Sequence, residues 1–118
     1  MRVGIVGGVE RNQNRYEEVA RAAGCEVEFH HGHMRGRGPE ALETLVERCD
    51  LIVIVTEINS HSAVRMTQKL SRKRGRRVLI VRRFGVSSFE QAARAAKAEE
   101  MRARLGASAG STLHAAAS

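Results

Sequence analysis

The fold is decided by the run Leu51-Ile52-Val53-Ile54-Val55, which is apolar at every position. Side chains along a strand alternate between the two faces of a sheet, so a strand without a polar position has both faces buried. This pattern is typical of a central strand in a parallel sheet that helices cover on both sides. We therefore predict an α/β fold with this strand at the centre of its sheet.

Three other short apolar runs are predicted as strands, and helical patterns separate them. These runs are residues 3–6, 27–29 and 78–81. Residues 26–29 alternate between polar and apolar, as a strand at the edge of a sheet does. Because strands that alternate with helices are joined by right-handed crossovers, we predict a doubly wound parallel sheet. It has four strands in the order 2-1-3-4, with helices on both faces.

Residues typical of helix starts precede or open each predicted helix. They are Asn14 with Glu17, Gly38-Pro39, Asn59 or Ser60, and Ser87 with Glu90. The last helix is expected to continue to Gly106, and the small and polar residues 107–118 are expected to form a disordered tail. The chain is thus predicted to be one α/β domain, residues 1–106, followed by a tail that contains His114.

Length and composition limit the function classes. A chain of 118 residues suits one domain, and a bulky cofactor would need a second subunit, so we expect a homodimer or higher homo-oligomer. No run approaches the roughly 18 apolar residues of a membrane helix, and no leader pattern precedes the first strand. We therefore expect a soluble, cytoplasmic protein. Cys25 and Cys49 lie outside any CxxC spacing and are expected to be buried, reduced thiols.

Four histidines follow predicted strands: His30, His31 and His33 follow the second, and His61 follows the third. Ligands of open parallel sheets bind outside the carboxyl ends of the strands at the switch point, here between the first and third strands. Neutral imidazole is the commonest side-chain ligand of metals, so the cluster suggests a metal or a metallo-cofactor. The alternative is that these histidines are turn residues that donate to backbone carbonyls.

Other residues at the same edge could assist a ligand. Gly7-Gly8 before a helix could cradle a phosphate, although a tight turn explains the pair equally well. Arg11 and Asn12 could hold a carboxylate, a propionate or a phosphate. Tyr16 and Asn59 are further candidates for a propionate or for a hydrogen bond to a distal ligand, with helix capping as the alternative for Asn59.

The net charge of +7 and the basic run at residues 72–77 raise nucleic-acid binding as a separate function. The run joins a predicted helix to the fourth strand, at the edge opposite the histidines, where loops are usually charged because they are solvated. Aromatic residues for base stacking are also few. We therefore place this function behind the histidine site, while non-specific, salt-sensitive binding to polyanions stays open.

Several motifs together resemble the bacterial domain of unknown function 2325 family over roughly residues 1–95. They are Gly7-Gly8 and His30-His31-Gly32 after strands, Asp50 before the apolar strand, and Ser60-His61 at a helix start. The resemblance implies a small Rossmann-like domain without an established enzymatic role, and binding of haem and of oxygen through His31 and His61. The extra His33, beside the loop at residues 34–38, departs from the pattern and leaves the identity of the ligand histidine open.

The residues at this edge favour haem over zinc. Catalytic zinc needs three protein ligands and a general base, and only Glu10 and Glu57 are near. Haem needs one or two axial imidazoles and cations for its propionates. We predict a haem protein, ligated by His31 and His61, that binds or senses a diatomic gas without catalysis of its own. The alternatives are a zinc-dependent hydrolase or phosphoryl-handling protein with the same histidines, and a basic nucleic-acid-binding module.

Overall fold

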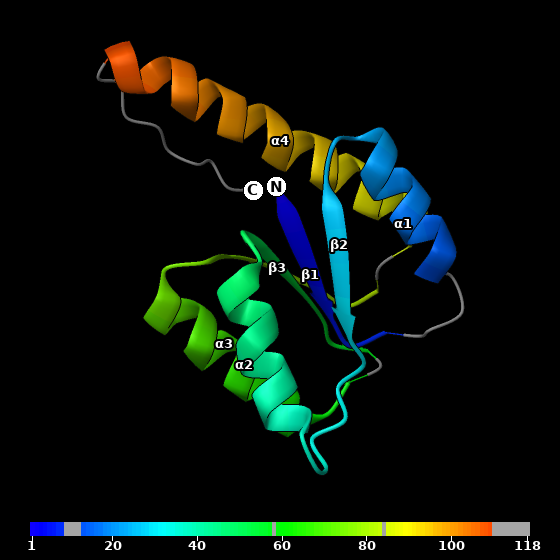
Figure 1. Ribbon diagram of the computed structural model, residues 1–118. Coiled ribbons are helices and arrows are strands. Elements are labelled where there is room, and N and C mark those ends of the chain that lie inside the picture. The colour runs from blue at the N-terminus through cyan, green and yellow to red at the C-terminus, as the bar shows by residue number, and fades with distance from the viewer. Residues whose placement is uncertain (9–12, 58, 84, 110–118) are drawn as a thin grey trace.

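The computed structural model describes residues 1–8, 13–57, 59–83 and 85–109. In this part of the chain strands and helices alternate, as predicted (Figure 1). In chain order the elements are β1 (Arg2–Val6), α1 (Gln13–Ala22), β2 (Glu26–His30), α2 (Gly38–Arg48), β3 (Leu51–Val55), α3 (His61–Arg74), β4 (Arg77–Val81) and α4 (Val86–Ala109).

The four strands form one parallel sheet in the order β2-β1-β3-β4. At the carboxyl edge Val6 of β1 is in register with His30 of β2 and with Ile54 of β3. Helices α1 and α4 lie on one face of the sheet, and α2 and α3 lie on the other (Figure 1). The predicted doubly wound sheet, its strand order and the central position of β3 are confirmed.

Each face of the sheet has its own hydrophobic core, and β3 contributes to both because all of its residues are buried. The core under α1 and α4 contains an edge-to-face contact between Tyr16 and Phe89, whose ring centroids lie 5.3 Å apart. The core under α2 and α3 is aliphatic and centres on Leu42 and Ile52. Burial of side chains of this size contributes about 1.5–3 kcal/mol each, so the two cores together hold the helices to the sheet.

Two of the predicted helix starts are wrong and two are confirmed. Helices α1 and α4 begin at Gln13 and Val86, so Asn14 and Ser87 lie inside the helices rather than capping them. In α4 the amide of Phe89 already donates to the carbonyl of Gly85 (2.9 Å), so helical hydrogen bonding begins before the capping pattern predicts. The starts at Gly38-Pro39 and at Ser60 are as predicted.

Helix α4 continues to Ala109, past the expected boundary at Gly106. The rest of the expected tail, residues 110–118 with His114, lies outside the described residues. The carboxyl-terminal part of α4 extends beyond the sheet (Figure 1), and the side chains of Met101 and Leu105 there are exposed. Within the described ranges, none of the helices combines the length and the apolar character needed to cross a bilayer.

Candidate functional site at the carboxyl edge of the sheet

Three segments meet at the carboxyl edge of the sheet: Gly7-Gly8 after β1, the loop after β2, and the segment between β3 and α3. The amide of Gly7 donates to the carbonyl of His30 at 2.7 Å, which continues the β1–β2 pairing past the strand ends. Ser60, just before α3, donates its hydroxyl to the carbonyl of Gly32 at 2.9 Å, which joins the β3–α3 segment to the loop after β2. The topology therefore brings the predicted segments together.

Asn59 is the centre of this edge. Its Nδ2 donates to the carbonyl oxygens of Val6, at 3.2 Å, and Val55, at 2.9 Å, which end the neighbouring strands β1 and β3. Its Oδ1 accepts the backbone N–H of Ser60 at 2.9 Å. Both donors of the amide and one acceptor site are thus used within the protein, so Asn59 has a structural role that capping alone does not describe.

Two glycines are required by the position of Asn59. Gly7 and Gly32 both have positive φ values, +95° and +87°, which non-glycine residues adopt only with strain. A Cβ atom on Gly7 would lie 2.5 Å from Nδ2 of Asn59, and one on Gly32 would lie 2.5 Å from its Oδ1. Gly8 also has a positive φ, but its Cβ would meet no atom of the described residues within 4 Å. The close packing therefore explains Gly7 and Gly32, and leaves Gly8 facing open space.

His30 is also part of this packing. Its side chain is 8% exposed, and its Nδ1 accepts the backbone N–H of Gly32 at 3.1 Å. Nδ1 is therefore unprotonated, so the proton is on Nε2, which donates to the carbonyl of Gly38 at 2.9 Å. Both ring nitrogens of His30 are occupied by backbone groups, as the turn-residue alternative predicts for this histidine. We call Gly7, His30, Gly32, Asn59 and Ser60 the Asn59 junction.

His31 leaves the sheet on the face covered by α1 and α4. Its ring stacks on that of Phe29, with an interplanar angle of 10° and centroids 6.2 Å apart, and its Nδ1 is shielded from solvent. Phe29 in turn contacts Tyr16 edge-to-face at 5.8 Å. Tyr16 lies in the core, and burial raises the pKa of its hydroxyl. The aromatic row from Phe89 to His31 therefore connects the core to the carboxyl edge.

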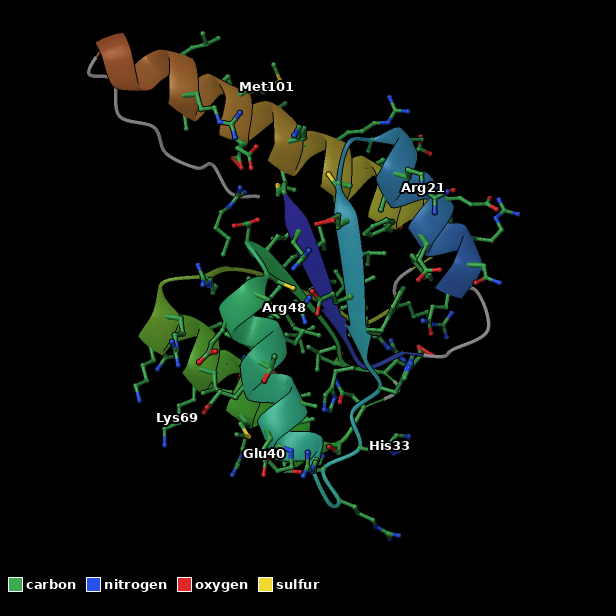
Figure 2. All side chains as sticks on the ribbon, viewed as in Figure 1. Arg21, His33, Glu40, Arg48, Lys69 and Met101 are labelled. Carbon is green, nitrogen blue, oxygen red and sulfur yellow. The ribbon has the colours of Figure 1, made fainter. Side chains whose placement is uncertain are left out.

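His61 and His33 are exposed. His61 is the first residue of α3 and follows the N-cap Ser60, whose hydroxyl accepts the N–H of Ala63 at 3.1 Å. His33 lies at the outside of the loop between β2 and α2 (Figure 2). Because β2 ends at His30, strand alternation does not determine the directions of the His31 and His33 side chains.

The described residues contain no group of three or more His, Cys, Asp and Glu side chains that could hold a metal ion. Glu57, one of the two carboxylates expected near the edge, forms an ion pair with Arg83 at 2.6 Å. Both cysteines are buried free thiols, as predicted, and burial raises the pKa of Cys49 to about 12. Candidates Arg11 and Asn12, like Glu10, lie outside the described residues.

Comparison with known proteins identifies a matching bacterial family and two similar bacterial proteins. Residues 2–96 match the family described as "Uncharacterized protein conserved in bacteria (DUF2325)". The chain is 33% identical over 90 residues to UPF0751 proteins from two strains of Desulfitobacterium hafniense, DSM 10664 / DCB-2 and Y51. Each match covers 75% of this chain and 88% of the relative. No solved structure matches the sequence significantly.

Proposed function

This chain belongs to the DUF2325 family, and from the residues at its carboxyl edge we propose that it binds haem through His31 and His61 and carries or senses a diatomic gas such as oxygen. One observation carries the proposal. The two histidines directly adjoin Gly32 and Ser60, whose hydrogen bond of 2.9 Å connects the loops after β2 and β3. His31, in the loop after β2, and His61, the first residue of α3, are thus the chain neighbours of the two residues that form this contact.

The number of available ligands supports haem rather than zinc. Catalytic zinc takes three protein ligands, whereas haem iron takes one or two axial imidazoles because the porphyrin supplies the other donors. His30 is bonded to the backbone groups of Gly32 and Gly38, and the described residues bring no three His, Cys, Asp or Glu side chains together around a metal ion. A haem needs only one or two imidazoles from the protein.

The surroundings of His31 support the same choice. Stacking on Phe29 fixes the plane of the imidazole and places an aromatic surface beside it, which a porphyrin ring can contact. Arg35 and Arg37 are exposed in the same loop, and guanidinium groups bind carboxylates such as propionates with two parallel hydrogen bonds. The chemistry of His31 therefore suits the iron of haem, and that of Arg35 and Arg37 suits its propionates.

Bound haem would supply the iron atom that coordinates a gas reversibly. The role of the protein would be to ligate the iron through its imidazoles, to bind the propionates and to limit the access of water. A chain of 118 residues has little room to enclose a porphyrin, so we propose that a second copy of the chain covers its other face. Glu57, one of the two carboxylates expected near this edge, is engaged in an ion pair with Arg83, which disfavours it as a general base.

The test is the absorption spectrum of protein purified with haem supplied, recorded oxidised, reduced and under oxygen. We expect a Soret band in the wild-type protein that shifts on reduction and again under oxygen. His31→Ala or His61→Ala should weaken or shift the band, because each removes a proposed ligand.

His33→Ala is the matched control, since His33 is an exposed histidine of the same loop. It should leave the spectrum unchanged, and a weakened or shifted band would instead assign the ligand role to His33. Absence of a Soret band in the wild type would overturn the haem proposal. Stoichiometric zinc without porphyrin absorbance would replace it with the zinc-dependent hydrolase or phosphoryl-handling alternative.

A further inference from the structure

The net positive charge of the chain comes from one segment. Residues 58–89 contain nine of the 20 Lys and Arg residues and none of the 13 Asp and Glu residues. The rest of the chain thus has 11 basic residues against 13 acidic ones, so the net charge of +7 comes entirely from this segment. The segment includes α3, which lies on one face of the sheet, and β4, the edge strand next to β3.

Four of the nine cations have partners elsewhere in the fold. Arg74 pairs with Glu47 of α2, Arg76 donates to the carbonyls of Val46 and Glu47, Arg77 pairs with Glu99 of α4, and Arg83 pairs with Glu57. Three of these belong to the basic run at residues 72–77. That run therefore fastens α3 and β4 to the neighbouring helices, and it is not simply a solvated loop.

Three other cations line the outer face of α3. Arg65, Lys69 and Arg72 are exposed, and the described part of the chain has no carboxylate in an ion pair with any of them. Their spacing of four and three residues places them on one face of the helix, opposite the buried Thr67 and Ser71. At about 1.5 Å per residue they span about 10 Å. Lys69 projects away from the sheet in Figure 2. We call these three residues the α3 cationic face.

Helix stability alone does not explain this face. Cations in the last turn of a helix interact favourably with its dipole, which accounts for Arg72. Arg65 and Lys69 lie earlier in α3, where the dipole gives no such benefit. Residues 61–74 contain no acidic side chain, so neither cation can form an i,i+4 pair within the helix. The two residues are thus placed for something outside the chain.

We infer that the α3 cationic face binds the phosphate backbone of double-stranded nucleic acid, without reading its sequence. Two of the three cations of this face are arginines, whose planar guanidinium groups bind phosphate oxygens with two parallel hydrogen bonds. Single-strand binding relies on aromatic side chains that stack on bases. The described aromatic residues Tyr16, Phe29 and Phe89 pack into the core on the opposite face of the sheet from α3. A duplex, whose phosphates are regularly spaced and whose bases are already stacked, is therefore the partner that fits.

The test measures fluorescence anisotropy of a labelled 20-base-pair duplex with the wild-type protein at several salt concentrations. Three phosphate contacts give a slope of roughly −2.7 in a plot of log affinity against log salt. Affinity should therefore fall about 40-fold between roughly 50 and 200 mM salt. The triple variant Arg65→Gln, Lys69→Gln, Arg72→Gln should lose most of this binding and nearly all of the slope.

A second triple variant is the matched control: Arg15→Gln, Arg21→Gln, Arg102→Gln. It removes the same charge from exposed arginines of α1 and α4, and Arg21 lies on the far side of the molecule from Lys69 (Figure 2). Its affinity for the duplex should stay within about 3-fold of the wild-type value, because salt screens charges that lie more than about 10 Å from the bound duplex. Circular dichroism melting verifies that both variants are folded.

Three results would overturn the inference. Equal losses in the two triple variants would assign the binding to net charge rather than to this face. Tighter binding of a single strand of equal length would exclude a duplex partner. Binding to vesicles of phosphatidylglycerol and phosphatidylcholine that depends on the α3 face, with no duplex binding, would make the partner a membrane surface.

Discussion

Helix α3 takes part in two regions that constrain their residues in different ways. At its start, Ser60 and Asn59 belong to the Asn59 junction, where side chains bond to backbone groups of β1, β3 and the loop after β2. Along its outer face, Arg65 and Lys69 are exposed to solvent. Shape and hydrogen bonding fix the first region, whereas only charge characterises the second. Substitutions should therefore reduce stability in the junction and binding on the outer face.

The largest expected effect is that of Gly7→Ala. The new Cβ would lie 2.5 Å from Nδ2 of Asn59 and 2.6 Å from the backbone oxygen of Val55, at a φ of +95°. Left-handed strain of about 1–2 kcal/mol and overpacking of about 1–3 kcal/mol together should cost about 3–4 kcal/mol. Urea unfolding followed by circular dichroism measures this loss of unfolding free energy.

Gly8→Ala is the matched control for this prediction. Gly8 has nearly the same φ, +89°, but within the described ranges its Cβ would meet no atom closer than 4 Å. Only the strain of about 1–2 kcal/mol should remain. Equal losses at the two positions would show that packing against Asn59 contributes nothing, which would break the comparison.

Asn59→Asp should cost about 2–3 kcal/mol. The carboxylate keeps the shape of the amide but cannot donate to the carbonyls of Val6 and Val55, which are left without these hydrogen bonds. Thermal melting at neutral pH measures the effect, with Asn59→Ala as the second variant. A change below about 0.5 kcal/mol in both would contradict the role of Asn59 in joining β1 to β3.

Ser60→Ala should cost about 1–2 kcal/mol. It removes the N-cap bond from Ala63 and the bond to the carbonyl of Gly32. Ser62, in the first turn of the same helix, makes only an exposed hydroxyl contact of 3.5 Å with Ser60, so Ser62→Ala should change the unfolding free energy by less than about 0.5 kcal/mol. If the two serines behave alike in urea unfolding, the junction does not extend to α3.

The smallest expected effect on stability is that of the triple variant Arg65→Gln, Lys69→Gln, Arg72→Gln. The side chains are exposed, so the change in unfolding free energy should stay within about 1 kcal/mol, most of it from Arg72 in the last turn. A larger loss, measured in the same urea titration, would mean that the outer face supports the fold and that the two regions are not distinct.

Most of the fold was predictable from local patterns. The uninterrupted apolar run in β3 indicates burial on both faces, and the alternation in β2 indicates an edge, because side-chain direction along a strand has a period of two residues. Helix starts were less predictable. Asn14 and Ser87 have the residue types of caps, but the helices begin before them, because capping preferences are worth only about 1 kcal/mol and packing outweighs them.

The location of the candidate site was predictable from the sequence, but the roles of its residues were not. Strand order alone brings the loops after β1, β2 and β3 to one edge. The sequence patterns favour His31 as the ligand but do not show that the ring of His30 bonds to Gly32 and Gly38, or that the ring of His31 stacks on Phe29. The sequence patterns also did not identify Arg65 and Lys69, although the lack of acidic residues between Glu57 and Glu90 indicates a cationic segment.

The sequence by itself determined the parallel α/β class, the strand order and the segregation of charge. These properties follow from periodicity, chain connectivity and composition, which are local or additive along the chain. Only the tertiary structure decided that Asn59 joins β1 to β3, that Gly7 and Gly32 pack against it, and that His30 is structural. Those roles depend on contacts between residues far apart in the chain, such as Asn59 with Val6 and Ser60 with Gly32. Such contacts exist only once the sheet has formed.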